Sequence, residues 1–328
     1  MIITRTPFRF TLGGGGTDLP SYYSKYGGFV FAAGINKYMF ISINRPVVDD
    51  LVRVKYSKSE TVSHRDELQH DIAREAMRMM EIENALEIVS MADAPAGTGL
   101  GSSGCYGVGL LNALHALKRE YVPLQQLAEE ACDLEINRLK KPIGKQDQYM
   151  AAFGGLTILE IGKGGRVTAT KANIPETAID DLSRNLLMFY TSTSRNANVI
   201  LDKQNRSAEQ GDQRVVELLH RIKEIGYKIR EAAEGGNLTD IGLLFDQHWQ
   251  CKKTLSPEVS NSDFDVIYNI AKEKGALGGK IVGAGGGGFF IFYVEERQAR
   301  FREEMKKLGL REMRYRFDFE GTKVLVNF

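Results

Sequence analysis

Apolar residues recur along this chain with two different periods, and their alternation predicts a mixture of helices and strands. Within residues 67–81 the apolar positions lie three or four residues apart, which is the period of an amphipathic helix. Residues 102–117 show the same period, whereas the shorter run LEIVSM at 86–91 is typical of a strand. Helices are expected at 19–26, 67–81, 102–117, 123–138, 147–152, 195–233, 237–254, 262–274 and 297–308; strands are expected at 1–12, 30–45, 51–57, 86–91, 156–161, 167–172, 185–191 and on both sides of a glycine run at 283–288.

The pattern changes near residue 184, which divides the chain into two expected domains. Before this point strands and helices alternate, and after it three helical stretches lead into a strand, the glycine run and another strand. A chain of 328 residues is about twice the length of a typical domain. We therefore predict an α+β fold with domains at 1–184 and 185–328.

Composition and charge exclude few classes of protein. Lys and Arg total 43 against 42 for Asp and Glu, so no overall charge would attract nucleic acid or an acidic membrane surface. Cys105, Cys132 and Cys251 are far apart, form no metal-binding spacing and fit a reducing compartment. The N-terminus lacks the apolar core of a signal peptide, and no apolar run approaches the ~18 residues that span a bilayer. The expected compartment is the cytoplasm, and neither nucleic acid nor a membrane is an expected partner.

The most unusual stretch is PAGTGLGSSG at residues 95–104, between an expected strand and an expected helix. Glycine loses more backbone entropy on folding than any other residue, so a loop this rich in glycine indicates close approach of the backbone to something. Three interpretations compete: a tight structural connection, a dinucleotide-binding fingerprint and a cradle for the phosphates of a nucleotide.

The phosphate cradle is the interpretation that the surrounding sequence favours. Gly99, Gly101 and Gly104 match G-x-G-x-x-G, but the second strand that a dinucleotide site needs ~20 residues later is missing. The same pattern recurs at 283–288, so it is not specific. In a phosphate cradle, free N–H groups at the start of the helix would bind the anion at the positive end of the helix dipole. The chain contains no G-x-x-x-x-G-K-[ST], which excludes a P-loop of the Walker type.

Three separated motifs together resemble those of the GHMP kinases, the galacto-, homoserine, mevalonate and phosphomevalonate kinases. PAGTGLGSS at 95–103 is similar to the phosphate loop of the family, PFRFTLGGGGTD at 7–18 to its first motif and KIVGAGGGG at 280–288 to its third. The resemblance implies ATP and Mg²⁺ as cofactors and an active site in a cleft between two domains. It further implies an N-terminal α+β domain with a left-handed βαβ unit, an exception to the usual hand, and a ferredoxin-like C-terminal domain.

Within the family, the first motif and KPIGKQDQY at 141–149 are most similar to the kinases of D-glycero-D-manno-heptose 7-phosphate. Those enzymes phosphorylate the anomeric hydroxyl to give the 1,7-bisphosphate, on the way to GDP-heptose and surface polysaccharide. The expected partners are then ATP and a phosphorylated sugar. Gly14-Gly15-Gly16 stands where galactokinases carry Gly-Glu-His, which leaves more room beside the sugar and argues against galactose. Fucokinases and other sugar 1-kinases are the nearest alternatives; a non-catalytic sugar sensor and an oxidoreductase are more distant ones.

The resemblance also assigns catalytic and nucleotide-binding roles. Asp147 aligns with the aspartate that orients the attacking hydroxyl and accepts its proton, although an Asp here could instead cap the helix at 147–152. Arg9 would offset the charge on the transferred phosphoryl group. Lys145 would act on Asp147 or contact phosphate, with a simple exposed lysine as the alternative. The expected catalytic residues are Asp147, Arg9 and Lys145; the expected ATP-binding residues are Pro95, Gly97, Gly99, Leu100, Gly101, Ser102, Ser103 and Gly104.

Magnesium is expected at Ser103 and Glu135. Mg²⁺ takes one or two carboxylates together with phosphate oxygens and water, and Glu135 matches, within one residue, a magnesium ligand of mevalonate kinases. The alternatives are a solvated glutamate beside Glu129 and Glu130, and Ser102 as the hydroxyl ligand.

The sugar is expected to contact the first motif. Asp18 would accept hydrogen bonds from sugar hydroxyls, unless it closes an Asx-turn. The glycine run at 283–288 would brace the phosphate loop and the substrate site, or serve packing alone. The expected substrate residues are Gly14, Gly15, Gly16, Thr17, Asp18, Arg195, Gly285 and Gly286. A phosphate on the sugar needs cations, for which the candidates are Arg195, His248, Lys252, Arg138, Lys140 and Lys141, and the sequence does not select among them.

Overall fold

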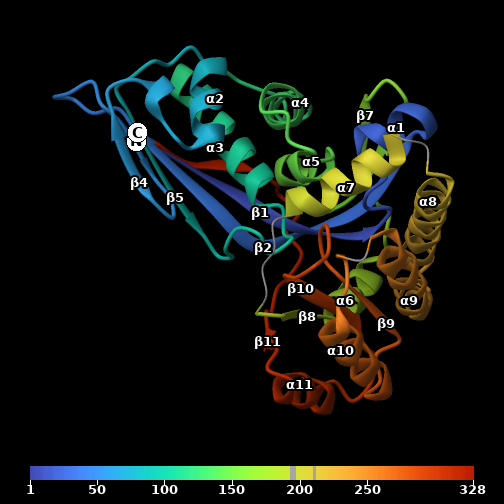
Figure 1. Cartoon of the computed structure of the whole chain (residues 1–328). Helices are drawn as coiled ribbons and strands as arrows, with labels where there is room; N and C mark the ends of the chain where they lie inside the picture. The colour runs from blue at the N-terminus through green and yellow to red at the C-terminus, as the bar shows by residue number, and fades with distance from the viewer. Residues whose placement is uncertain (193–196, 210–211, 257) are drawn as a thin grey trace.

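The computed structural model describes residues 1–192, 197–209, 212–256 and 258–328 of the chain. They form a sheet of eight strands and a sheet of four, each with its own helices (Figure 1). Figure 1 shows the larger sheet in the upper part of the view and the smaller sheet in the lower part. The fold is the two-domain α+β arrangement that the sequence predicts.

Two long strands, β1 (Ile2–Gly13) and β2 (Gly28–Asn44), form the centre of the first sheet. The strand order is β12-β1-β2-β5-β3-β4, with β6 paired to β2 and β7 to β6. Among the described pairs of this sheet, β3 with β5 is parallel and the rest are antiparallel. The remaining strands are β3 (Val52–Lys55), β4 (Ser59–Val62), β5 (Leu86–Ala92), β6 (Leu156–Ile161), β7 (Val167–Lys171) and β12 (Lys323–Asn327).

A layer of helices covers one face of this sheet (Figure 1). At its centre lies α3 (Ser102–Lys118), most of whose residues are buried because it packs against β1, β2 and α5. A short π-helical segment, Asp133–Arg138, continues α4, and such segments occur often at functional sites. The other helices of this part are α1 (Pro20–Tyr26), α2 (Asp71–Met79), α4 (Leu124–Cys132) and α5 (Gln146–Phe153).

The second sheet is fully antiparallel, with the order β11-β8-β10-β9. Numbered within this domain, that order is 4-1-3-2, and helices separate the first strand from the second and the third from the fourth, which is the expected ferredoxin-like arrangement. Its strands are β8 (Leu186–Tyr190), β9 (Gly278–Ile281), β10 (Phe289–Tyr293) and β11 (Arg311–Glu312). The helices of this part of the chain are α6 (Glu176–Asn185), α7 (Ala197–Glu209), α8 (Gln213–Glu234), α9 (Leu238–Leu255), α10 (Ser262–Glu273) and α11 (Gln298–Lys307), of which α7 contacts α1 and α8 packs against β1 and β2.

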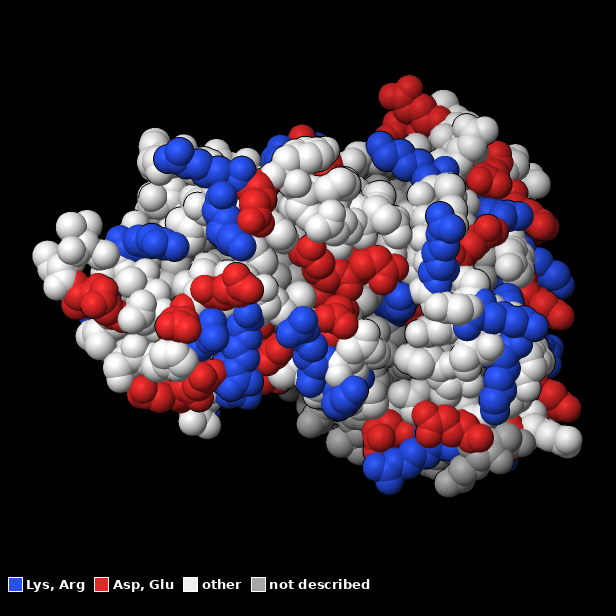
Figure 2. Space-filling model, turned by 90° about the horizontal axis from the view of Figure 1, so that it is seen from above, with Lys and Arg blue, Asp and Glu red and all other residues white. Residues whose placement is uncertain are grey.

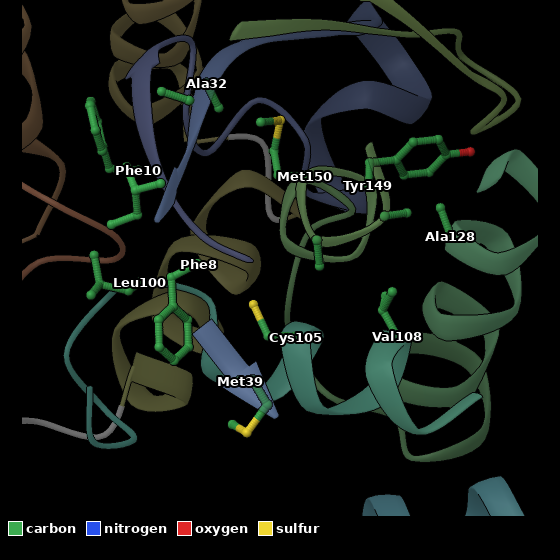
Figure 3. Packing of buried hydrophobic residues seen from close by; sticks show 14 of the residues in the cluster. Phe8, Phe10, Ala32, Met39, Leu100, Cys105, Val108, Ala128, Tyr149 and Met150 are labelled. Carbon is green, nitrogen blue, oxygen red and sulfur yellow. The ribbon is translucent and has the colours of Figure 1, made fainter. Parts of the chain in front are cut away.

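The core of the first domain anchors the glycine loop. Leu100 is 1% exposed and lies in the same packed cluster as Phe8 of β1 and Cys105 of α3 (Figure 3). Burial of one large side chain fixes the middle of the loop, so the residues on both sides of it are held in place at the start of α3.

The last strand joins the two ends of the chain. β12 pairs antiparallel with β1, and the N–H of Phe328 donates to the carbonyl of Met1 at 3.1 Å. The C-terminal residues therefore belong to the first sheet, although they follow the second in sequence. The boundary near residue 184 and the left-handed crossover stay predictions.

The described surface carries no dominant charge. Figure 2 shows acidic and basic side chains interspersed over the face seen from above, with a group of acidic ones near its centre. Among the helices that the structure describes, none is long and apolar enough to cross a membrane.

Candidate active site

Three glycines shape the loop that precedes α3. Gly97, Gly99 and Gly101 have φ of +79°, +83° and +81°, a left-handed conformation that only glycine adopts without strain. The N-cap of α3 is Gly101, which provides no side-chain cap for the first turn. The first N–H groups of α3 are thus left for an external acceptor at the positive end of the helix dipole. This geometry is what a phosphate cradle requires, and the binding of phosphate here stays a prediction.

The glycine run of the second domain packs directly on this loop. A Cβ on Gly283 would lie 2.6 Å from Cα of Gly99, and a Cβ on Gly288 would lie 2.2 Å from the carbonyl oxygen of Thr98. Both distances are too short for any side chain, so the two glycine segments touch backbone to backbone. Gly285 and Gly286, expected at the substrate, face Val259 instead: the N–H of Gly286 donates to its carbonyl at 2.9 Å.

Arg9 and Asp147 form an ion pair beside the loop. Arg9 donates from Nε and Nη2 to Oδ1 of Asp147 at 2.9 and 2.5 Å, and from Nη1 to the carbonyl of Gly99 at 2.6 Å. Asp147 lies in the first turn of α5, whose N-cap is Lys145, so it is not the cap of this helix. A Cβ on Gly101 would lie 3.4 Å from Oδ2 of Asp147. Among the described residues, none donates a hydrogen bond to Oδ2, which leaves this oxygen free to accept one.

Glu135 lies beside the first turn of α3. It is fully buried, accepts a hydrogen bond from Nε2 of Gln148 at 2.8 Å and lies 3.4 Å from Nζ of Lys141. Burial raises the pKa of Glu135, against the opposing effects of Lys141, Gln148 and the nearby hydroxyl of Ser103. A carboxylate next to a serine hydroxyl at a phosphate cradle is a donor set that suits Mg²⁺, which needs few protein ligands where phosphate oxygens supply the rest.

Asp18 is buried in the first domain next to the start of α5. It accepts from the N–H of Gln146 at 3.1 Å and from the N–H of Gly16 at 3.1 Å, so it is held by the chain on both sides and does not form the usual Asx-turn. Burial raises the pKa of Asp18, and the charge of Asp147 acts in the same direction.

Apart from Glu135, which is buried and does not line it, these groups line one cavity of about 270 Å³ between the two domains. Of the residues predicted from the sequence, it is lined by Arg9, Gly15, Gly16, Asp18, Gly97, Gly99, Gly101, Ser102, Ser103, Asp147, His248 and Lys252. Other residues of the same motifs do not line the cavity but pack behind the residues that do. Thr17 Oγ1 lies 2.8 and 2.7 Å from the carbonyls of Gly14 and Phe29, and Leu100 is in the core.

Several expected site residues point elsewhere. Lys145 donates to Glu129 at 3.0 Å and to the carbonyl of Gly165 at 2.7 Å, so the expected contact with Asp147 is not formed. Arg138 pairs with Asp133 and Glu75, whereas Lys140 is exposed and Lys141 pairs with Asp71 and Glu135. Arg195 lies outside the described residues.

Several lining residues were not predicted as site residues from the sequence, and two of them, Lys280 and Gln146, carry polar groups next to the predicted ones. Lys280 is 2% exposed although it belongs to the third motif, and a single lysine in an otherwise apolar strand is the signal that could have found it. Gln146 precedes Asp147 in the segment KPIGKQDQY; its side-chain carbonyl accepts from Thr11 at 2.6 Å and its amide donates to Asp18 at 3.4 Å.

Comparisons with known proteins agree with this architecture. Residues 69–155 match the profile of the GHMP kinases N terminal domain, and residues 229–309 match that of GHMP kinases C terminal. The chain is 28% identical to D-glycero-alpha-D-manno-heptose 7-phosphate kinase of Campylobacter jejuni, over 98% of this chain and 97% of that protein. It is 25% identical to L-fucokinase/L-fucose-1-P guanylyltransferase of Bacteroides fragilis, over 91% of this chain and 35% of that protein. The crystal structure of a D-glycero-D-manno-heptose 1-phosphate kinase from Bacteroides thetaiotaomicron has a TM-score of 0.83 at 22% identity, with 100% of both chains covered.

The fold and the site define a phosphotransferase with an alcohol group as acceptor, of the sugar-kinase type. The two matching profiles stand in the expected order and together cover about half of the chain. The chain belongs to the GHMP kinase family, whose members use ATP.

Proposed function

We propose that this protein transfers the γ-phosphoryl group of ATP to the anomeric hydroxyl of D-glycero-D-manno-heptose 7-phosphate, giving the 1,7-bisphosphate. The observation that carries the proposal is the ion pair of Arg9 and Asp147 beside the glycine loop, in a cavity shared by both domains. The choice of sugar is supported by the similarity to a heptose 7-phosphate kinase over nearly the full length of both proteins. We propose the cytoplasm as the compartment of the reaction.

In the proposed mechanism the backbone positions the nucleotide and two side chains act on the acceptor. The N–H groups of Ser102, Ser103 and Gly104 hold the phosphates at the start of α3. Oδ2 of Asp147 accepts a hydrogen bond from the anomeric hydroxyl and takes its proton as the new O–P bond forms and the bond to ADP breaks. Arg9 fixes Oδ1 of Asp147, and its charge offsets the negative charge on the transferred group.

Magnesium is part of the proposal because the donor set fits it. Glu135 and Ser103 would hold the ion next to the phosphates, where it would neutralise phosphate charge. The described residues include no group of three or more His, Cys, Asp or Glu placed to bind a metal, which suits a site whose other ligands come from the nucleotide.

Asp18 is proposed as the residue that recognises the sugar. It lines the cavity, and its raised pKa reflects burial without a cationic partner among the described residues. Hydrogen bonds from sugar hydroxyls would satisfy its remaining acceptor capacity. Gly15 and Gly16 line the cavity next to it, so a long sugar would meet little steric hindrance there.

Fucose is the second candidate, since a relative that covers 91% of this chain is a fucokinase fused to another activity. A screen that follows ADP release with heptose 7-phosphate, free fucose, galactose and other sugars separates the two. The proposal predicts turnover of heptose 7-phosphate and little turnover of fucose. Efficient turnover of fucose, with none of the heptose phosphate, would overturn the substrate assignment and leave the family intact.

A further inference from the structure

Three nitrogen-bearing side chains of the second domain line the cavity next to Arg9. His248 and Lys252 lie one turn apart on α9, and Lys280 lies on β9. Besides burial, the charge of Lys252 lowers the pKa of Lys280, and the charges of Lys280 and Lys252 lower the pKa of His248. The charge of Arg9 in turn lowers the pKa of Lys252. The basic groups therefore form a row that starts at the Arg9–Asp147 pair and continues along the wall of the second domain.

The hydrogen bonds of this row leave donors unused. Lys280 donates to the carbonyl of Leu12 at 2.5 Å and lies 4.7 Å from the ring centroid of Phe245. Lys252 donates to the carbonyls of Ile281, at 3.1 Å, and Gly283. An ammonium group has three donors, so at least two of Lys280 and one of Lys252 are free.

His248 has no hydrogen-bond partner among the described residues. It is 2% exposed, and neither ring nitrogen makes a hydrogen bond to any described residue. A buried polar group without a partner costs free energy, so its presence at the wall of a cavity indicates that a ligand supplies the missing bond.

The row also lacks a negative counter-charge. Within the described part of the chain, no carboxylate lies within 4 Å of Nζ of Lys252 or of Lys280. Asp147 is engaged by Arg9, and Asp18 is held by backbone N–H groups. A cation that is buried without an anion costs free energy, and a bound anion would offset that cost.

The pKa shifts of Lys252, Lys280 and His248 agree with their place as buried bases that have no anionic partner among the described residues. Burial, assisted by Arg9, lowers the pKa of Lys252 to about 7. Burial and the neighbouring Lys252 hold the pKa of Lys280 well below its ordinary value, and burial does the same to the pKa of His248. A bound dianion would reverse these shifts, because an opposite charge nearby favours the charged form of each base.

We propose that Lys252, Lys280 and His248 form the subsite for the phosphate group that the sugar acceptor already carries, an assignment that rests on the proposed function. The triphosphate of ATP occupies the glycine loop in the first domain, so this second anion belongs to the acceptor. The ammonium groups of Lys252 and Lys280 and an imidazole N–H of His248 bind the terminal phosphate. Asp18 and Asp147 accept hydrogen bonds from hydroxyl groups elsewhere on the sugar. The subsite selects sugars that bear a phosphate over the same sugars without one.

The test compares Lys280→Met and His248→Leu with the wild-type enzyme in steady-state assays of ADP release with heptose 7-phosphate. His248→Leu removes no existing hydrogen bond, so it keeps the test valid where a lysine variant disturbs folding. Each variant is expected to raise KM for the sugar phosphate about tenfold or more, with KM for ATP little changed. Lys253→Met is the matched control, because Lys253 is next to Lys252 but pairs with Asp265 outside the cavity. An unchanged KM for the sugar phosphate, or a rise in KM for ATP instead, would overturn the assignment.

A second measurement separates failure of this inference from failure of the proposed function. With the glycine loop saturated by a non-hydrolysable ATP analogue and Mg²⁺, inorganic phosphate is titrated calorimetrically into wild type and both variants. Phosphate binding to wild type that is lost in both variants supports the subsite even if heptose 7-phosphate is not turned over. The absence of binding to wild type, or equal binding to the variants, refutes the subsite even if the heptose phosphate is a good substrate.

Discussion

Arg9 and Asp147 are 138 positions apart in sequence, yet the closest contact between them is 2.5 Å. Arg9 is almost completely buried on β1, whereas Asp147 retains some exposure at the start of α5. The arginine binds a single carboxylate oxygen with two of its nitrogens, which fixes the direction in which the other oxygen points. A carboxylate held in this way is preorganised to bind a hydroxyl that enters the cleft.

The first prediction at this scale concerns Asp147→Asn. The amide keeps the shape of the side chain but is a poor proton acceptor, so kcat should fall about 10²–10⁴-fold with little change in KM for ATP. Turnover is measured by ADP release with saturating sugar phosphate.

The control for that experiment is Asp49→Asn. Asp49 also pairs with an arginine, Arg53, but lies outside the cavity. The Asp49→Asn variant should retain wild-type turnover. Full activity in the Asp147 variant would remove this residue from the mechanism.

A second prediction concerns His115, whose ring nitrogens lie 2.8 Å from Glu120 and 2.7 Å from Glu130. The hydrogen bond with Glu130, and then that with Glu120, raise the pKa of His115. The folded protein thus holds this proton more tightly than the unfolded chain, whose histidine titrates at about 6.5. The stabilisation is fully present below that pH and is lost as the pH rises through the higher pKa of the folded state.

His115→Gln should therefore lower the free energy of unfolding more at about pH 6 than at about pH 9, as measured by urea unfolding. His64→Gln, at a partly exposed histidine that lies 3.3 Å from a single carboxylate, Asp66, serves as the control. An equal loss of stability at both pH values in the His115 variant would contradict this account.

Single residues were predictable where a motif fixed their backbone position. Asp147, Arg9, Ser103 and Asp18 lie at the cavity because their motifs set both the residue and its element. Lys145 is two positions from Asp147 at the start of a helix, and residues at this spacing do not share a helix face, so its side chain turns to Glu129. Lys280 was missed although a lysine in an otherwise apolar strand is unusual, because its partners, a distant carbonyl and an aromatic ring, are not visible in the local sequence.

At the scale of elements, two glycine segments from different domains form one contact. The loop before α3 and the turn between β9 and β10 approach so closely that a Cβ on Gly99 would lie 2.5 Å from the carbonyl oxygen of Val282. The position of the loop therefore depends on the second domain as well as on its own helix. This contact requires glycine at Gly99, Gly283 and Gly288, where a Cβ would meet the backbone of the other segment.

Gly99→Ala is predicted to displace the loop. Its φ of +83° and the missing space for a Cβ both disfavour alanine, so the free energy of unfolding should fall by about 1–3 kcal/mol. KM for ATP should rise in parallel, as measured by ADP release. Gly164→Ala is the control, because nothing lies within 4 Å of a Cβ there, and it should change neither quantity. A Gly99 variant with wild-type stability and KM would show that the contact is unimportant.

Helices and strands in which apolar residues recur with a clear period were predictable from the sequence, whereas elements made mainly of polar residues were not. The helix expected at 102–117 and the strand expected at 86–91 correspond to α3 and β5. No element was expected for β4, since SETV has no buried residue, or for α6, which buries only Ala178 and Leu182. Tertiary pairing determines such segments, and local sequence does not reveal it.

At the scale of the whole molecule, the cavity exists only because both domains contribute to it. The first domain supplies the phosphate loop, Arg9, Asp18 and Asp147; the second supplies the turn that touches the loop and the basic row. The order of the three motifs predicted this division from sequence. The return of β12 to the first sheet was not predictable, because a short strand at the end of a chain carries no signal of its partner.

The central claim is that backbone N–H groups at the start of α3 hold the triphosphate while Asp147 faces the acceptor hydroxyl. A crystal structure with a non-hydrolysable ATP analogue, Mg²⁺ and heptose 7-phosphate tests it most directly. The account predicts the β- and γ-phosphates against the loop between Gly99 and Ser103, with the anomeric hydroxyl within hydrogen-bond distance of Oδ2 of Asp147. A triphosphate bound elsewhere, with this loop empty, would contradict it.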